Sequence, residues 1–188
     1  FVVTNTTDGN ATNQLRGALL AAAASAGPHN ISLSAGTFTL TNGQIIIGAI
    51  ATNIKITGVS ATQTIITTQG ANADRLLLIN ETGTVANVVV EFSNIQFRGG
   101  RLKSDPFGGG AILCGGPNNQ TRFSDCIFHD NSIAAGGGTT GGALNQSGGG
   151  LLEVQRCTFT ANQCSTGDGG ALYYFLDNNV SGSLVINR

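Results

Sequence analysis

Charged residues are scarce in this sequence and make up only 10% of its 188 residues. The formal net charge is -1, so the chain lacks the excess of basic residues with which proteins bind nucleic acids or anionic membranes. It also has no stretch of about 18 consecutive apolar residues, which excludes a membrane-spanning helix. We therefore expect no nucleic-acid partner and no membrane span.

Methionine and tryptophan are absent and only 3 prolines occur, whereas 28 residues are glycine. Without accompanying proline, this glycine content is typical of turns between strands and not of a disordered segment. Apolar runs of three to six residues alternate with Gly, Asn, Ser and Asp, as in "TFTL", "NIKITG" and "SLVIN". Short runs bounded by turn residues predict β-strands, so we expect an all-β protein.

Three phenylalanines mark an internal repeat, because Phe97, Phe128 and Phe159 are each 31 residues apart. Neighbouring positions keep the same spacing: apolar Phe92, Phe123 and Val154; charged Glu91, Arg122 and Glu153; and Cys126 with Cys157. Downstream, Gly-Gly-Ala-Ile/Leu recurs at 109–112, 141–144 and 169–172. A spacing that varies by a few residues indicates strands at fixed positions joined by turns of variable length.

A period near 30 residues, made of strands without a crossover helix, predicts a solenoid whose coils stack as parallel sheets, that is, a parallel β-helix. We expect a single domain over residues 1–188, with about five to six coils over residues 31–188. Residues 1–30 are expected to hold a strand and a capping helix, with Thr12 or Asn13 as N-cap and Gly27 as the stop.

The repeat also predicts which side chains face inward and which face outward. The three phenylalanines that define the period would stack inside the coil. Outside, two columns of opposite charges are expected: Glu91, Arg122 and Glu153 in one, and Asp125 beside Arg156 in the other. The charges therefore have a structural role before any catalytic one.

The four cysteines form no Cys-x-x-Cys pair, which favours disulfides over zinc and an oxidising compartment. The 31-residue register places Cys126 and Cys157 at the same position on neighbouring coils, within reach of a disulfide. Cys114 would then be left for Cys164. The alternatives are a reduced set or a local bridge between Cys157 and Cys164.

Asn-x-Ser/Thr acceptors for N-glycosylation are unusually frequent. Most of them lie between apolar runs, where a glycan would reach solvent, and this favours a glycosylated, secreted protein. The alternative is that a chain rich in Asn and Thr contains the pattern by chance. The predicted acceptors are Asn5, Asn10, Asn30, Asn80, Asn119, Asn145 and Asn179.

The Gly-Gly-Ala-Ile/Leu motif occurs together with Phe-x-x-Asn, found as Phe128-His129-Asp130-Asn131 and Phe159-Thr160-Ala161-Asn162. This combination resembles the repeats of polymorphic outer-membrane proteins and related secreted right-handed β-helix surface proteins. The segment "DGNATNQLRGALLAAA" is similar to the N-terminal cap of many such bacterial and archaeal surface proteins. The resemblance covers residues 1–30 and 90–175. It implies a right-handed, single-stranded parallel β-helix outside the cell, in families of adhesins, passengers and surface structural proteins.

Polysaccharide lyases and pectin hydrolases are also β-helices, but the Asn-Thr-Asp, Asp-Asp and Gly-His-Gly motifs of the hydrolases are missing here. Arg101-Leu102-Lys103 is a lone partial match to their Arg-Ile-Lys. The densest polar cluster contains Arg98, His129, Asp130, Arg101, Lys103 and Asp105, and could serve as an acid/base site or contact a sugar acid. Because the repeat puts its members at ordinary outward positions, we expect no catalysis, no cofactor and, at the turn residues Asp130 and Asp168, no metal.

The segment "VSGSLVINR" aligns with "SGGGLLEVQR", which in the preceding coil leads into Cys157. An N-terminal strand from another molecule is therefore expected to complete this open coil, with Phe1, Val2, Val3 and Thr4 meeting Leu184, Val185 and Ile186. The alternative is a truncated or disordered end.

The leading hypothesis is a non-catalytic, N-glycosylated extracellular structural or surface protein that polymerises head to tail with itself. The alternative is a carbohydrate-binding or polysaccharide-degrading module, or a fragment of an adhesin.

Overall fold

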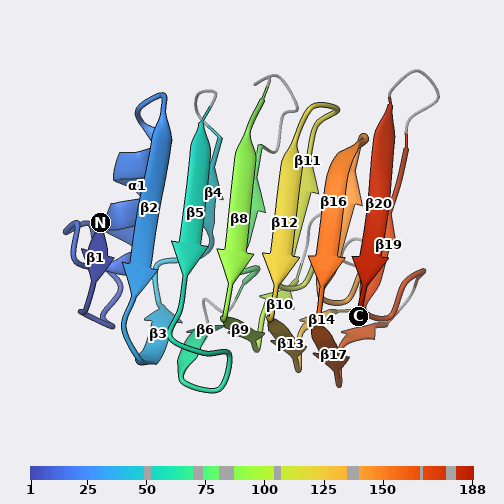
Figure 1. Cartoon of the computed structure of the whole chain (residues 1–188). Coiled ribbons are helices and arrows are strands. Elements are labelled where there is room, and N and C mark those ends of the chain that lie inside the picture. Colours follow the sequence, from blue (N-terminus) through green and yellow to red (C-terminus); the bar gives the residue numbers. More distant parts are fainter. Residues whose placement is uncertain are drawn as a thin grey trace.

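The short apolar runs form strands that stack coil upon coil in a computed structural model of the chain (Figure 1). The structure describes all residues except 49–51, 70–73, 81–86, 104–106, 135–139, 166 and 177–180. The strands of the described residues pair in parallel throughout. The prediction of an all-β parallel β-helix is confirmed.

Four sheets make up the wall of the solenoid. The front sheet contains β1 (Val2–Val3), β2 (Pro28–Leu33), β5 (Asn53–Thr57), β8 (Val89–Ser93), β12 (Gln120–Ser124), β16 (Gly150–Gln155) and β20 (Gly182–Asn187). The lower sheet contains β3 (Gly36–Leu40), β6 (Thr64–Thr68), β9 (Gln96–Arg98), β13 (Ile127–His129) and β17 (Thr158–Thr160). The corner sheet contains β10 (Arg101–Leu102), β14 (Ser132–Ile133) and β18 (Gln163–Cys164). The back sheet contains β4 (Ile45–Ile47), β7 (Leu77–Ile79), β11 (Ile112–Gly115), β15 (Leu144–Ser147) and β19 (Leu172–Tyr174).

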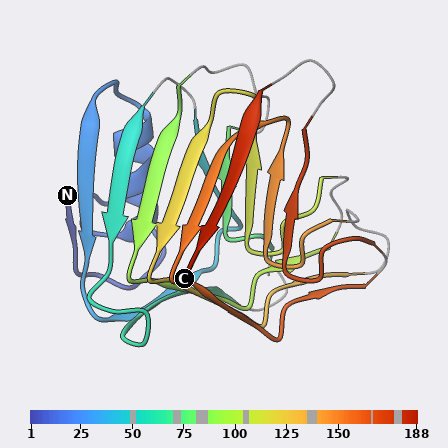
Figure 2. The ribbon, with the colours of Figure 1, turned by 45° about the vertical axis from the view of Figure 1, so that its right-hand side comes forward.

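The chain winds in a right-handed sense. From each strand of the front sheet it passes to the lower sheet and then to the back sheet, and it returns to the front sheet one position further along (Figures 1 and 2). The lower and back sheets have five strands each, so the described residues make about five turns. The strand β20 then lies at the open edge of the front sheet, opposite β1.

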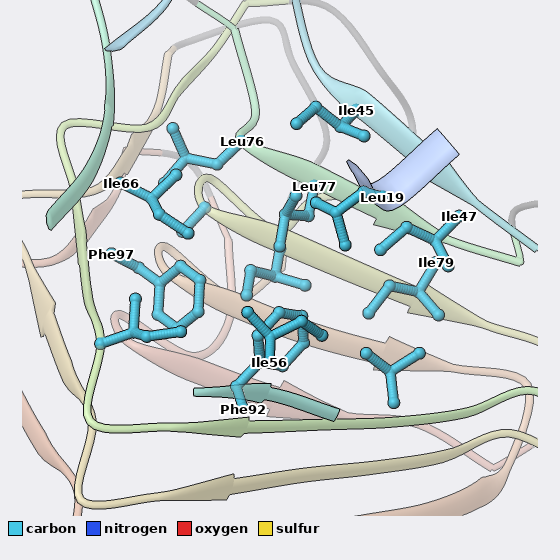
Figure 3. Close-up of a cluster of buried hydrophobic side chains, with 14 of the residues drawn as sticks. Leu19, Ile45, Ile47, Ile56, Ile66, Leu76, Leu77, Ile79, Phe92 and Phe97 are labelled. Carbon is cyan, nitrogen blue, oxygen red and sulfur yellow. The ribbon is translucent and has the colours of Figure 1, made fainter. Parts of the chain in front are cut away.

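Columns of apolar side chains, one from each coil, fill the lumen (Figure 3). Phe128 pairs in register with Phe97 on one side and Phe159 on the other, with ring centroids 5.1 and 4.6 Å apart. Phe92 and Phe123 form a second stack at 5.2 Å. Each stacked pair contributes about 0.5–1.5 kcal/mol beyond the burial of its area. The predicted inward stacking is therefore confirmed.

Each Gly-Gly-Ala motif stands where the chain turns into the back sheet. Its first glycine has a positive φ, at 74° for Gly109 and 70° for Gly141, a conformation that other residues adopt at a cost. At its second glycine a Cβ would overlap the carbonyl oxygen of the next coil: that of Gly142 for Gly110, and that of Gly170 for Gly142. The motif is thus required by the close approach of successive coils.

One short helix is present in the described part of the chain: α1 (Leu15–Ala23), which covers the lumen at the β1 end. Its N-cap is Gln14, so the prediction of Thr12 or Asn13 is wrong. The reason is that Thr12 and Asn13 form a turn closed by a hydrogen bond from the N–H of Gln14 to the carbonyl of Ala11, and the carbonyl of Asn13 accepts from the N–H groups of Thr4 and Asn5. The helix therefore begins only after Gln14, whose backbone is extended. Among the described residues, no helix is long and apolar enough to cross a membrane.

An ion pair ties the segment before α1 to the first coil. The Nε of Arg16 lies 2.6 Å from Oδ1 of Asp8, and both side chains are almost fully buried. Arg16 also donates to the carbonyl of Gly43, while Oδ2 of Asp8 accepts from the N–H groups of Thr41 and Asn42 at 2.8 Å. Because every charged atom of this pair has a partner, the pair, here called the cap latch, holds the cap in place.

Candidate binding groove and end faces

A polar groove of about 490 Å³ lies on the outer face of the lower sheet. Side chains alternate along each strand, so every second residue faces outward. The strand register aligns Thr39 of β3, Thr67 of β6, Arg98 of β9 and His129 of β13 in one outward row. Neighbouring members of the row are about 4.8 Å apart. The row therefore presents hydroxyl and cationic groups at regular intervals along the solenoid.

One wall of the groove is an ion pair at the corner between the lower and corner sheets. The NH2 of Arg101 lies 2.7 Å from Oδ2 of Asp130, and Arg101 also donates to the carbonyls of Asp130 and Gly100. Asp130 itself has a φ of 53°, which forms the sharp corner. The charges of Arg101 and Asp130 thus compensate each other.

Arg98 lies exposed in the groove and makes no ion pair or side-chain hydrogen bond with the described residues. Its strand neighbour His129 has Nδ1 3.0 Å from the hydroxyl of Thr160. Of the polar cluster predicted from the sequence, the structure therefore brings Arg98 and His129 side by side and joins Arg101 to Asp130. Lys103 is exposed after β10, and Asp105 lies outside the described residues. This arrangement can bind an anionic group beside hydroxyl groups.

The outer face of the front sheet carries the predicted column of alternating charges. Arg122 donates to Glu153 at 3.1 Å and to Glu91 at 3.2 Å, and Lys55 lies beside Glu91 in register. These side chains line a shallow hollow of about 260 Å³. The second predicted column, Asp125 with Arg156, is also present at 2.7 Å. Because Arg122 binds both glutamates, this column links three successive coils through β8, β12 and β16.

Three of the seven predicted glycosylation acceptors, Asn80, Asn119 and Asn145, are buried. The side-chain nitrogen of Asn80 donates to Oδ1 of Asn119 at 2.8 Å, and those of Asn119 and Asn145 also donate inside the protein. A glycan on any of these nitrogens would have no room and would remove a buried hydrogen bond. Asn10 and Asn30 are exposed, Asn5 is half-buried, and Asn179 lies outside the described residues.

All four cysteines are free thiols in this structure. Cys126 and Cys157 lie at matching positions on adjacent coils, where the N–H of Thr158 donates to the carbonyl of Cys126 at 2.9 Å. Cys114 and Cys164 lie in different sheets and two coils apart, in β11 and β18. Two coils are about 9.6 Å along the axis, beyond the reach of a disulfide, so the proposed pairing of Cys114 with Cys164 is wrong.

The N-terminal strand β1 pairs within its own molecule, and its predicted pairing with a second molecule stays a prediction. Val2 and Val3 pair with Ser32 and Leu33 in the front sheet, and not in the lower sheet, where a strand following the Cys-x-Phe pattern would lie. Along the front sheet, the successive registers align Val2 with Asn187 of β20. Strand addition by Phe1, Val2, Val3 and Thr4 would therefore miss most of Leu184, Val185 and Ile186.

The two ends of the solenoid nevertheless expose apolar side chains. At the β1 end, which we call the cap face, they are Phe1, Val2 and Leu20. At the β20 end, which we call the open face, they are Phe175, Leu176, Leu184 and Ile186. In the open face, Leu184 and Ile186 continue the lumen columns of Leu152 and Val154 but are 39% and 63% exposed, because no described coil covers them.

Sequence reasoning missed the threonines of the groove and the outer face of α1. Thr37 and Thr39 alternate in "GTFTL", a signal that could have been read as an outward hydroxyl pair. The helix sequence "LRGALLAAA" has Arg16 as its single charged residue, and the cap latch turns Arg16 inward. A cap helix without an exposed charge is unusual, because the caps of solenoids commonly have a polar outer face.

No family model matches the chain, no curated protein matches its sequence, and no solved structure matches its fold. The resemblance to polymorphic outer-membrane protein repeats stays a prediction. The geometry of the groove and of the end faces is therefore the basis for proposing a function.

Proposed function

We propose that the protein is a non-catalytic structural subunit outside the cell that polymerises head to tail. The cap face of one molecule packs on the open face of the next. The observation that carries this proposal is the location of the exposed large apolar side chains: of the ten among the described residues, seven belong to the cap face or the open face. Such an interface joins two different surfaces, so each added subunit leaves a new free end and a filament grows.

The cap face favours this contact because the outer side of α1 carries no charge: the one charged residue of the helix, Arg16, is turned inward. Solenoid caps keep their coils soluble by presenting a polar outer side. The outer side of α1 instead presents Leu20, Ala21 and Ala24, flanked by Phe1 and Val2 of the neighbouring strand. These side chains lose contact with water when a second molecule covers them.

The open face favours the contact because it retains the features of a covered coil. Gly170 keeps the second glycine of the Gly-Gly-Ala motif, although a Cβ there would meet nothing within 4 Å. At Gly110 and Gly142 the same position is filled by the carbonyl of the following coil. A second copy seated on the open face supplies a neighbour that Gly170 lacks in the single molecule.

Sedimentation velocity and electron microscopy test this proposal with one variant on each face. Wild-type protein should form filaments as its concentration rises. Leu20→Glu and Ile186→Glu should each remain monomeric, since both put a charge into the apolar contact. Mixing the two variants should give dimers and nothing longer, because each supplies the intact face that the other lacks. The control Phe107→Glu alters an exposed apolar residue between β10 and β11, in the middle of the rod and away from both ends, and should polymerise normally.

Wild-type protein that stays monomeric at all concentrations would contradict the proposal. So would filaments of both face variants. Dimers of Leu20→Glu that do not need Ile186→Glu would instead indicate a symmetric contact between two open faces.

Location outside the cell and attached N-glycans belong to the same proposal and rest on the accessible acceptor Asn30 on the outer face of the front sheet. Asn5 and Asn10 are also accessible, but they lie in the cap segment, where a glycan would obstruct the packing of the cap face. The intact mass of the protein from its own source, before and after enzymatic deglycosylation, measures the occupancy. Asn30→Gln should remove one glycan, whereas Asn119→Gln should leave the glycan mass unchanged. A chain that carries no glycan would contradict this part of the proposal.

A further inference from the structure

We propose that the groove over the lower sheet binds an acidic saccharide, with Arg98 as the residue that pairs with its carboxylate. This inference goes beyond the structural role proposed above, and it concerns the side wall of the rod and not its ends.

The floor of the groove is built from hydroxyl groups. Thr37 and Thr39 of β3 and Thr67 of β6 face outward, with the apolar Ile65 beside Thr37. Thr68 at the end of β6 and Gln69 after it extend the polar lining. Hydroxyl and amide groups both donate and accept hydrogen bonds, as a saccharide with many hydroxyl groups requires. The spacing of about 4.8 Å between strands lets successive threonines reach successive hydroxyl groups of an extended chain.

Arg98 supplies the charge in this lining. Five other arginines donate hydrogen bonds from their guanidinium groups to carbonyls, amides or carboxylates of the described residues. They are Arg16, Arg75, Arg101, Arg122 and Arg156. Arg98 makes no such bond with the described residues, and the nearby carboxylate of Asp130 is held by Arg101. A guanidinium in this state is free to bind a carboxylate in a two-point contact.

The choice of an acidic ligand over a neutral one follows from what lines the groove. Neutral sugars are commonly held by apolar contact with aromatic rings, but the described lining contains no aromatic side chain. Ile65 is the one large apolar side chain among the described lining residues, so binding there comes mainly from hydrogen bonds and from the charge of Arg98. A uronic acid oligomer, which has a carboxylate and hydroxyl groups on each unit, matches both.

Isothermal titration with an oligogalacturonate tests the proposal, with a neutral malto-oligosaccharide of the same length and inorganic phosphate as comparison ligands. Titrations in the Leu20→Glu background separate this experiment from polymerisation. Wild-type protein should bind the oligogalacturonate, and binding should weaken as salt concentration rises. Arg98→Ala should bind at least about tenfold more weakly, the ratio expected for a lost charge-assisted hydrogen bond, and Arg98→Lys should lie between them.

Lys55→Ala is the matched control, because it removes one positive charge from the front sheet, outside the groove, and should leave the affinity unchanged. Equal binding of acidic and neutral oligomers would overturn the proposal, as would equal losses from Arg98→Ala and Lys55→Ala. Phosphate that binds as tightly as the oligogalacturonate would reduce the groove to a simple anion site and would also overturn it.

Discussion

The side-chain nitrogen of Asn162 donates a hydrogen bond of 2.9 Å to the carbonyl oxygen of Phe128, a residue 34 positions earlier in the chain. Asn131 makes the same bond to Phe97 at 3.1 Å. In each case the asparagine of one coil binds the phenylalanine backbone of the coil before it. The Phe-x-x-Asn motif thus joins neighbouring coils, with the ring filling the lumen and the amide closing the corner.

Replacing Asn131 with alanine should destabilise the protein by about 2–4 kcal/mol. The Asn131 side chain is fully buried, accepts from the N–H of Gly100 at 2.9 Å and donates to Phe97 and to Oδ1 of Asn162. Alanine removes the bonds to Phe97 and Asn162 and leaves the Gly100 N–H without its partner, and an unpaired buried group costs about 1–3 kcal/mol. Urea unfolding followed by circular dichroism measures the loss.

The control for this prediction is Asn10→Ala, which removes an exposed asparagine side chain from the segment before α1. Its free energy of unfolding should stay close to the wild-type value. An Asn131→Ala variant as stable as Asn10→Ala would show that the ladder of asparagines does not hold the coils together.

The coil and its register were predictable because they depend on side chains that repeat at a fixed spacing. Thus the stack of Phe97 on Phe128 and the pairing of Asp125 with Arg156 follow directly from the 31-residue period. The N-terminal coils lack the clean motif, yet Ile66 still takes the lumen position next to Phe97. Volume and polarity, not identity, decide which residue is accepted there.

The burial of polar residues could not be predicted in the same way. Asn80 and Asn119 read as solvent-facing acceptors, whereas each is buried by bonding to partners far away in the sequence or across a turn. Arg75 is likewise buried, where it donates to the carbonyls of Gly108 and Gly109. Such a residue is buried only because a particular fold brings its partners to it, and a spacing pattern does not contain that information.

Alanine at Gly142 should destabilise the protein by about 3 kcal/mol or more, whereas alanine at Gly170 should not. A Cβ on Gly142 would overlap the carbonyl of Gly170 and lie 2.6 Å from the backbone carbon of Gln163, so one coil would have to move. At Gly170 a Cβ meets nothing within 4 Å. Thermal unfolding at low concentration compares the two variants.

The same pair of variants reports on assembly. In the monomer, Gly170→Ala should unfold like the wild type, but its filaments should be weaker because the Cβ intrudes on the molecule that packs there. Equal stability of Gly142→Ala and Gly170→Ala would refute the role given to the second glycine of the motif.

Oxidation should join Cys126 to Cys157. The hydrogen bond between the two thiols lowers the pKa of Cys157, while that bond and burial raise the pKa of Cys126. The Cys157 thiolate therefore attacks an external disulfide such as oxidised glutathione and releases one thiol, and the Cys126 sulfur then displaces the second. Closing this loop should stabilise the protein by about 3–4 kcal/mol.

Mass spectrometry of peptides from protein incubated with oxidised glutathione measures this bridge, and Cys126→Ser should leave Cys157 as a mixed disulfide. Cys114 is the internal control, since burial raises its pKa to about 12 and should keep it unmodified in the folded protein. Detection of a Cys157–Cys164 bridge in place of Cys126–Cys157 would contradict the prediction.

Asp8→Asn should cost about 3 kcal/mol at neutral pH, because it leaves the buried guanidinium of Arg16 without its counter-charge. Burial alone would raise the pKa of Asp8, but hydrogen bonds from Arg16, Asn42 and Thr41 outweigh it and hold the pKa below its ordinary value of 3.8. A depressed folded-state pKa contributes stability that is present above the unfolded value and is lost as the pH falls through the folded value. The difference between wild type and Asp8→Asn should therefore be constant from pH 7 to about pH 5 and should shrink below about pH 4.

Urea unfolding at several pH values measures that difference, with Asp125→Asn as the matched control. Asp125 also pairs with an arginine, Arg156, but both side chains are about half exposed, so its loss should change stability far less. If the cap latch holds α1 on the first coil, Asp8→Asn should also speed proteolysis near residues 1–14 at neutral pH, and Asp125→Asn should not. A difference from wild type that persists unchanged at pH 3 would mean that Asp8 acts through shape and hydrogen bonding and not through its charge.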